Sequence, residues 1–119
     1  MNLNQVTVPS VDVARAVQFY QLLGLRLIVS SHPRYARLEC PDGEGTFSIH
    51  EVEALPSGPG VVVYFECADL DAQVAALLAK GIAFDTLPTD QAWLWREASL
   101  RDPDGNALEL IDGTCEYDA

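Results

Sequence analysis

The sequence predicts an α+β domain made of two copies of one unit, in which a strand, a helix and three further strands follow one another. Three observations predict this fold class: helix start and stop signals recur at a constant spacing, a Pro-Asp-Gly turn recurs late in each half, and strand-like segments fill the intervals in the same order. Asp69 follows Asp12 by 57 positions (69 − 12), and Gly81 follows Gly24 by the same number (81 − 24). An internal repeat of this kind indicates the architecture before any single motif does.

Apolar spacing and turn residues place the elements of the first half. Residues 3–8 alternate between apolar and polar side chains, as a strand does. A helix is expected over residues 11–23, because its apolar side chains recur at helical spacing, Ser10 can cap it, and Gly24 ends it. Three strands are then expected at residues 25–30, 35–40 and 46–52, separated by turns.

The second half repeats this order after a stretch rich in proline and glycine. Residues 56–60 are the expected linker between a first module at 1–55 and a second module at 61–112. A strand is expected at 61–66, followed by a helix that Asp69 caps and that ends at Lys80 and Gly81. Further strands are expected at 82–86, 92–100 and 107–111, and residues 113–119 form a polar tail.

Neither half is long enough to be stable alone, because its sheet would leave one broad face uncovered. We therefore expect the two modules to pair into one domain with a curved, eight-stranded mixed sheet. The helices would cover the convex side of this sheet, and the concave side would form a groove for a ligand.

Composition excludes several classes of partner. The chain has 119 residues, with 7 Lys and Arg against 18 Asp and Glu, and a formal net charge of −11. Such a surface repels phosphate, so neither nucleic acid nor an anionic membrane is an expected partner. No apolar run approaches the roughly 20 residues that span a bilayer, and the first residues lack the pattern of a signal peptide, so a cytoplasmic location is expected.

Several short segments, taken in order, resemble one known superfamily over nearly the whole chain, to about residue 112. They are Gln5-Val6-Thr7-Val8 before Val11-Asp12-Val13, Phe19-Tyr20 before Leu23-Gly24-Leu25, Ala68-Asp69-Leu70-Asp71, and Asp102-Pro103-Asp104-Gly105-Asn106 before Leu108-Glu109-Leu110. This order is similar to that of the vicinal oxygen chelate superfamily, which includes glyoxalase I, the extradiol dioxygenases and the bleomycin resistance proteins. The resemblance also implies a homodimer with its grooves at or near the subunit contact.

In metal-dependent members, matching strands of the two modules supply the ligands. The resemblance assigns the first-strand positions to Gln5 and Val62, and the last-strand positions to His50 and Glu109. Imidazole, carboxylate and amide oxygen suit a divalent ion such as Zn, Ni, Mn or Fe. A valine has no donor atom, so we expect a protein without a cofactor, with a metal held by Gln5, His50 and Glu109 as the alternative.

Other residues of the expected groove suit an organic ligand. Tyr64 and Glu66 alternate onto one face of their strand, and Trp93 and Trp95 share one face of the strand predicted at 92–100. Two tryptophans so spaced can stack on a planar or cationic ligand, and they can equally pack at an interface between modules or subunits. Glu66 and Glu109 would attract positive charge.

Three hypotheses about function remain open at this point. The first is a metal-free protein that sequesters an aromatic or cationic small molecule, similar in design to the bleomycin resistance proteins. The second is a metal-dependent lyase or isomerase resembling glyoxalase I (lactoylglutathione lyase), in which Glu109 moves the proton. The third is a non-catalytic protein-interaction module with a vestigial groove. Whether the chain is an enzyme stays undecided.

Overall fold

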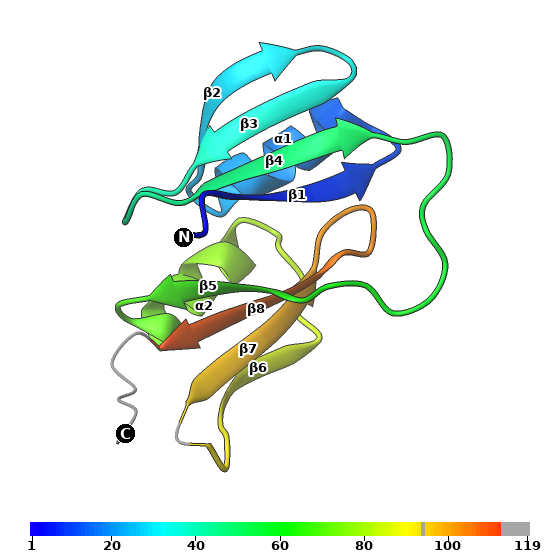
Figure 1. Cartoon of the computed structure of the whole chain (residues 1–119). Helices are drawn as coiled ribbons and strands as arrows, with labels where there is room; N and C mark the ends of the chain where they lie inside the picture. The colour runs from blue at the N-terminus through cyan, green and yellow to red at the C-terminus, as the bar shows by residue number, and fades with distance from the viewer. Residues whose placement is uncertain (94, 113–119) are drawn as a thin grey trace. The chain divides into compact units, whose positions relative to one another are not determined.

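The computed structural model describes residues 1–93 and 95–112, and it has the predicted order of elements twice over (Figure 1). The first module contains β1 (Gln5–Ser10), α1 (Val13–Leu22), β2 (Arg26–Ser31), β3 (Tyr35–Glu39) and β4 (Thr46–Glu51). The second contains β5 (Val63–Cys67), α2 (Leu70–Ala79), β6 (Thr86–Asp90), β7 (Arg96–Arg101) and β8 (Ala107–Asp112). The prediction of an α+β fold with two βαβββ modules is confirmed.

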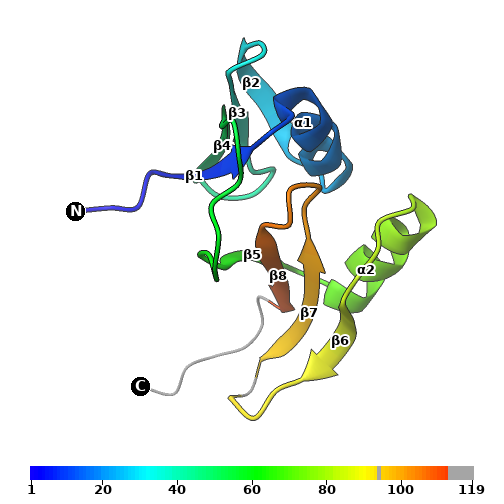
Figure 2. The same cartoon turned by 90° about the vertical axis from the view of Figure 1, so that its right-hand side faces the viewer.

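Each module has its own four-stranded mixed sheet. The strand orders are β1-β4-β3-β2 and β5-β8-β7-β6, and in both sheets the first strand runs parallel to its neighbour while the other pairs are antiparallel. One helix lies on one side of each sheet (Figure 2). Between helix and sheet lie buried side chains, such as Tyr20, Phe47 and Ile49 in the first module and Val74, Leu100 and Leu108 in the second. The other side of each sheet is called its open face below.

The two helices begin and end at equivalent positions. Asp12 accepts a hydrogen bond from the backbone N–H of Arg15 (3.1 Å), as Asp69 does from that of Ala72 (3.2 Å). The expectation that Ser10 caps the first helix is wrong, because its hydroxyl instead accepts the backbone N–H of Asp12 (3.0 Å). The helix starts and the helix ends both keep the spacing of 57 (70 − 13 and 79 − 22).

Both helices stop at a glycine with a left-handed backbone. Gly24 has φ +107° and Gly81 has φ +90°, a conformation that side chains on L-residues disfavour. These two glycines explain why the stop signals could be read from the sequence.

Two strands of the second module lie later in the chain than expected. The strand predicted at 82–86 is found at Thr86–Asp90, and the strand predicted at 92–100 begins only at Arg96. Pro88 lies inside β6, which is an edge strand whose pairing with β7 is irregular between Thr86 and Thr89. An edge strand tolerates proline because its outer N–H groups need no partner in the sheet.

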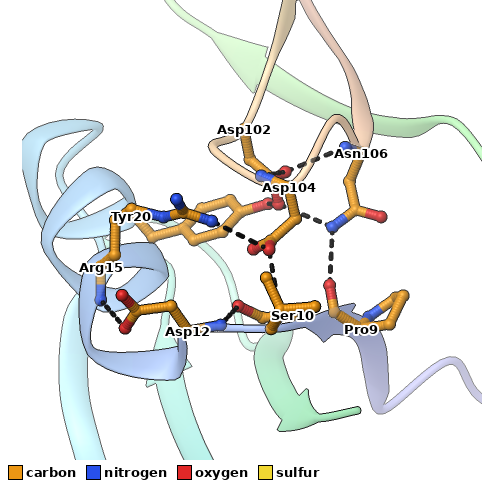
Figure 3. Close-up of polar contacts among 9 residues, drawn as sticks. Pro9, Ser10, Asp12, Arg15, Tyr20, Asp102, Asp104 and Asn106 are labelled. Carbon is orange, nitrogen blue, oxygen red and sulfur yellow. Dashed lines mark hydrogen bonds and ion pairs between the residues drawn. The ribbon is translucent and has the colours of Figure 1, made fainter. Parts of the chain in front are cut away.

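A turn from the second half of the sequence belongs to the first compact unit. This unit comprises residues 1–59 and 102–106, and the rest of the chain from Gly60 forms the second unit. The hydroxyl of Tyr20, on α1, donates to Asp102 Oδ2 at 2.6 Å, and both side chains are buried (Figure 3). Burial, followed by the charge of Asp102, raises the pKa of Tyr20 far above its usual value.

Three further contacts hold the same turn in place (Figure 3). Asp104 accepts from the backbone N–H of Val11 (3.0 Å) and from the guanidinium of Arg15 (3.2 Å). The Asn106 side chain donates to the carbonyl of Pro9 (3.0 Å). The first module is therefore completed by residues that lie far beyond it in the sequence.

No helix in the described part of the chain is long and apolar enough to cross a membrane. The polar tail expected at 113–119 lies outside the described residues.

Candidate functional site

The open face of the second module carries most of the residues that the sequence analysis selected for ligand binding. Tyr64 of β5 pairs with Glu109 of β8, and Glu109 pairs in turn with Ser99 of β7. Their neighbours Leu108, Leu110, Ala98 and Leu100 are buried, so alternation places the three polar side chains on the face opposite α2. Glu97 lies two residues before Ser99 on β7 and shares this face.

Within the described part of the chain, Glu109 accepts a hydrogen bond through one of its two carboxylate oxygens. The hydroxyl of Ser99 donates to its Oε1 at 2.6 Å. Its Oε2 is buried and accepts no hydrogen bond from any described residue. A buried acceptor without a donor is costly, so this oxygen keeps an unmet hydrogen-bonding requirement.

The two tryptophans do not share a strand, contrary to the sequence prediction. Trp93 lies in the turn that precedes β7, and Trp95 lies one residue before that strand begins. They nevertheless reach the same face, because the indole N–H of Trp93 donates to Glu97 Oε1 at 2.8 Å. Trp95 contacts Tyr64 edge to face, with ring centroids 6.2 Å apart.

Glu97 is a functional candidate that the sequence analysis did not select. It is only 7% exposed, although it is a carboxylate on the open face. The alternation of Glu97 with Trp95 and Ser99 along the strand could have placed its side chain on the open face. The sequence does not show, however, which neighbours would bury that side chain.

The two carboxylates, Glu97 and Glu109, have no basic partner among the described residues. Among the described residues, the ion pairs join Arg15 to Asp104, Arg26 to Glu39, Arg96 to Asp71 and Asp90, and Arg101 to Asp85, and none includes Glu97 or Glu109. Desolvation, then the charge of Glu97 and then that of Glu109, raises the pKa of the Tyr64 phenol. The face is therefore both aromatic and electronegative. We call Tyr64, Trp93, Trp95, Glu97 and Glu109 the acidic-aromatic face.

Glu66 and Val62 lie at the margin of this set. Glu66 is exposed on the same strand as Tyr64, two residues further on, and so alternates onto the same face. Val62, which precedes β5, exposes 41% of its surface.

The open face of the first module is polar but internally satisfied. Gln5 Nε2 donates to the Tyr35 hydroxyl (3.4 Å), and Gln5 Oε1 accepts from the Thr46 hydroxyl (3.2 Å). The hydroxyls of Thr7 and Ser48 share a hydrogen bond of 2.6 Å. His50, at the end of β4, is exposed.

Strand register identifies the counterpart of Glu109 in the first module. Thr7 pairs with Ser48, and Tyr64, which follows Thr7 by 57 positions (64 − 7), pairs with Glu109. Ser48 therefore occupies the equivalent position, whereas His50 lies one step further along the same face.

These side chains fit a divalent metal poorly. The Gln5 amide is hydrogen bonded at both its nitrogen and its oxygen, and the Ser48 hydroxyl is bonded to that of Thr7. The two remaining positions hold Val62, which has no donor atom, and the single carboxylate Glu109. In the part of the chain that the structure describes, no group of three or more His, Cys, Asp or Glu side chains could hold an ion. A metal bound by Gln5, His50 and Glu109 stays a prediction that this donor chemistry does not favour.

Comparison with known proteins decides the family. A model of the Glyoxalase/Bleomycin resistance protein/Dioxygenase superfamily matches residues 2–110. The chain belongs to this superfamily. Among curated protein sequences, none matches this superfamily member significantly.

Solved structures support the fold of this superfamily member. The lactoylglutathione lyase from Agrobacterium tumefaciens is 18% identical with a TM-score of 0.79, and the match covers 94% of this chain and 93% of that one. A glyoxalase/bleomycin resistance protein/dioxygenase from Nocardioides is 25% identical with a TM-score of 0.78, covering 100% of this chain and 89% of that one. TioX from Micromonospora sp. ML1 is 21% identical with a TM-score of 0.75, covering 94% of this chain and 98% of that one. At these identities the likeness establishes the fold and leaves the ligand undetermined.

Proposed function

We propose that this protein binds and sequesters an aromatic cation on the acidic-aromatic face of its second module, without a metal. The observation that carries the proposal is the pairing of two buried or half-buried carboxylates, which have no basic partner in the described chain, with three aromatic side chains on the same face. A cation supplies the missing charge, and a planar ring supplies a surface for the aromatic side chains.

The exposure of the rings supports this function. Tyr64 is 52% exposed and Trp93 is 57% exposed, so both offer apolar surface that a ligand would cover. Cations are attracted to the faces of such rings, and most strongly to tryptophan. The net charge of −11 adds a long-range attraction for cations that weakens with salt.

A matched series of naphthalene compounds tests the proposal by calorimetry. The probes are naphthalen-2-ylmethyl-trimethylammonium, the neutral naphthalen-2-ylmethanol and the anionic naphthalen-2-ylacetate. We expect the affinity to fall from cation to neutral compound to anion, and we expect added salt to weaken only the binding of the cation. Equal affinity for all three would overturn the proposal, and so would a failure of these three compounds and of the primary cation naphthalen-2-ylmethylammonium to bind.

Glu109 favours one alternative function. A carboxylate with a free, buried oxygen can act as a general base, and a lyase or isomerase would need such a group to move a proton between adjacent carbons. The hemithioacetal of methylglyoxal and glutathione tests this, with Ni²⁺ or Zn²⁺ added. Turnover that Glu109→Gln abolishes would establish the enzyme and displace sequestration. We expect no turnover.

Two further expectations from the sequence analysis, one from the family resemblance and one from the apolar pattern of the chain, remain proposals. A homodimer is tested by sedimentation of the purified protein, and a cytoplasmic location by fractionation of cells that express it. A monomer at all concentrations would contradict the first, and recovery outside the cytoplasm would contradict the second.

A further inference from the structure

The two carboxylates of the acidic-aromatic face differ in what they already bind. Glu97 Oε1 accepts the indole N–H of Trp93 at 2.8 Å. Glu109 Oε1 accepts the hydroxyl of Ser99 at 2.6 Å, but Glu109 Oε2 is buried without a donor from the described chain. Glu97 thus binds the Trp93 side chain, whereas Glu109 keeps one acceptor oxygen, Oε2, without a donor among the described residues.

The unfilled acceptor restricts the chemistry of the cation. A hydrogen bond to an ionised carboxylate is stronger than one between neutral groups, and leaving the buried oxygen unpaired carries a penalty. Among cations, one with an N–H group, such as a protonated amine or a guanidinium, can remove that penalty by donating to this oxygen, and it does so with a charge-assisted hydrogen bond. A quaternary ammonium carries the same charge but has no donor, and its methyl groups keep the nitrogen away from a buried atom.

We propose that Glu109 Oε2 is the acceptor for an N–H group of the ligand's cation, and that the ligands of this face are aromatic compounds with a protonated amine or guanidinium. This inference rests on the proposed function, and it narrows the class of ligand from aromatic cations to those that carry an N–H group. Glu97 is a positioning residue in this scheme, because it orients Trp93 and contributes negative charge without taking the ligand's donor.

Wild-type protein alone provides the first test. Naphthalen-2-ylmethylammonium and its trimethylammonium analogue share ring and charge and differ in the N–H groups. We expect the protonated amine to bind about tenfold more tightly, the size of one charge-assisted hydrogen bond. If both cations bind equally and more tightly than the neutral alcohol, the proposed function stands and the role of Glu109 falls. If neither cation binds, the proposed function itself falls.

Two isosteric variants separate the roles of the carboxylates. Glu109→Gln leaves a single acceptor oxygen, which the Ser99 hydroxyl binds, and turns an NH2 group toward the N–H of the ligand, so we expect it to abolish the preference for the amine over the quaternary cation. Glu97→Gln keeps an acceptor for the Trp93 indole, so we expect it to weaken both cations by a similar factor and to preserve the preference. Glu53→Gln, an exposed residue of the first module, is the control for loss of one charge.

The preference for the amine over the quaternary cation, compared across these variants, tests the assignment of Glu109. A preference that survives in Glu109→Gln, or disappears in Glu97→Gln instead, would overturn the assignment. Thermal unfolding of each variant, followed by circular dichroism, shows that the changes in affinity arise in folded protein.

Discussion

The two modules share a topology, but their open faces handle polar groups in opposite ways. In the first module Gln5 is hydrogen bonded at both ends of its amide, and Ser48 is bonded to Thr7. In the second, Glu109 keeps a buried oxygen without a donor from the described residues, and the pKa of Tyr64 is raised by desolvation and by two carboxylates. The polar side chains Gln5, Thr7 and Ser48 of the first open face are thus hydrogen bonded within their module, whereas the second open face keeps a buried acceptor and negative charge without partners among the described residues, and our proposal assigns both to a ligand.

The largest expected effect concerns the turn that completes the first module. Asp102→Ala removes the acceptor of the Tyr20 hydroxyl, of the Asn106 side chain and of two backbone N–H groups. We expect the free energy of unfolding to fall by about 3 kcal/mol or more, because several buried donors lose their partner. Denaturation in urea measures this loss.

The corresponding turn of the first half supplies the control. Asp42 follows Pro41 there and is exposed, so Asp42→Ala should change the free energy of unfolding by less than about 0.5 kcal/mol. Equal stability of the two variants would mean that the turn at Asp102 does not contribute as the contacts indicate.

A second prediction compares one tyrosine from each open face. Tyr64→Leu removes a ring from the acidic-aromatic face, and we expect it to weaken binding of naphthalen-2-ylmethyl-trimethylammonium about tenfold. Tyr35→Leu removes a ring from the other face and should leave this affinity unchanged. Calorimetry on both variants makes the comparison. A loss of affinity in Tyr35→Leu would show that our scheme places the ligand on the wrong module.

A third prediction uses the Tyr64 phenol as a reporter of the charge around it. Because nearby carboxylates disfavour the phenolate, Glu97→Gln or Glu109→Gln should lower the pKa of Tyr64 toward its ordinary value. A bound cation should lower it as well. Spectrophotometric titration against a Tyr64→Phe reference isolates this group.

The sign of the linked stability change follows from the same shift. The raised pKa means that the folded state holds the phenolic proton of Tyr64 more tightly than the unfolded state does. The resulting contribution to stability is fully present below the ordinary tyrosine pKa and is lost as the pH rises from there through the raised pKa of the folded state. If Glu53→Gln moved the pKa of Tyr64 as much as the two face variants do, the local origin of the shift would be disproved.

The smallest expected effect lies at the edge of the first sheet. Arg26 and Glu39 form an exposed ion pair across β2 and β3. Glu39→Gln should lower the free energy of unfolding by less than about 0.5 kcal/mol, and salt should reduce even that difference. A larger loss would mean that the first face depends on charge more than its hydrogen bonds suggest.

Local signals allowed the repeat and the faces of several strands to be predicted. Asp69 caps its helix as expected, Gly24 and Gly81 end theirs, and the alternation that placed Tyr64 and Glu109 on one face holds in the strand register. These features depend on dihedral preferences, capping bonds and side-chain alternation, which act over a few residues.

Long-range contacts explain what the sequence analysis missed. The strand expected at 82–86 lies later, at Thr86–Asp90, because pairing at a sheet edge tolerates Pro88. Trp93 reaches the open face through its hydrogen bond to Glu97 and not through strand alternation. Ser48, not His50, pairs in the register equivalent to that of Glu109.

The amino-acid sequence by itself determined the two βαβββ modules, their helix boundaries to within two residues and the family, because each depends on short-range patterns repeated at a fixed interval. Only the tertiary structure decided that residues 102–106 complete the first module, that Glu97 is buried beside Trp93, and that one oxygen of Glu109 has no donor among the described residues. Burial and hydrogen-bond satisfaction are set by neighbours that lie far away in the sequence, and no local pattern records them.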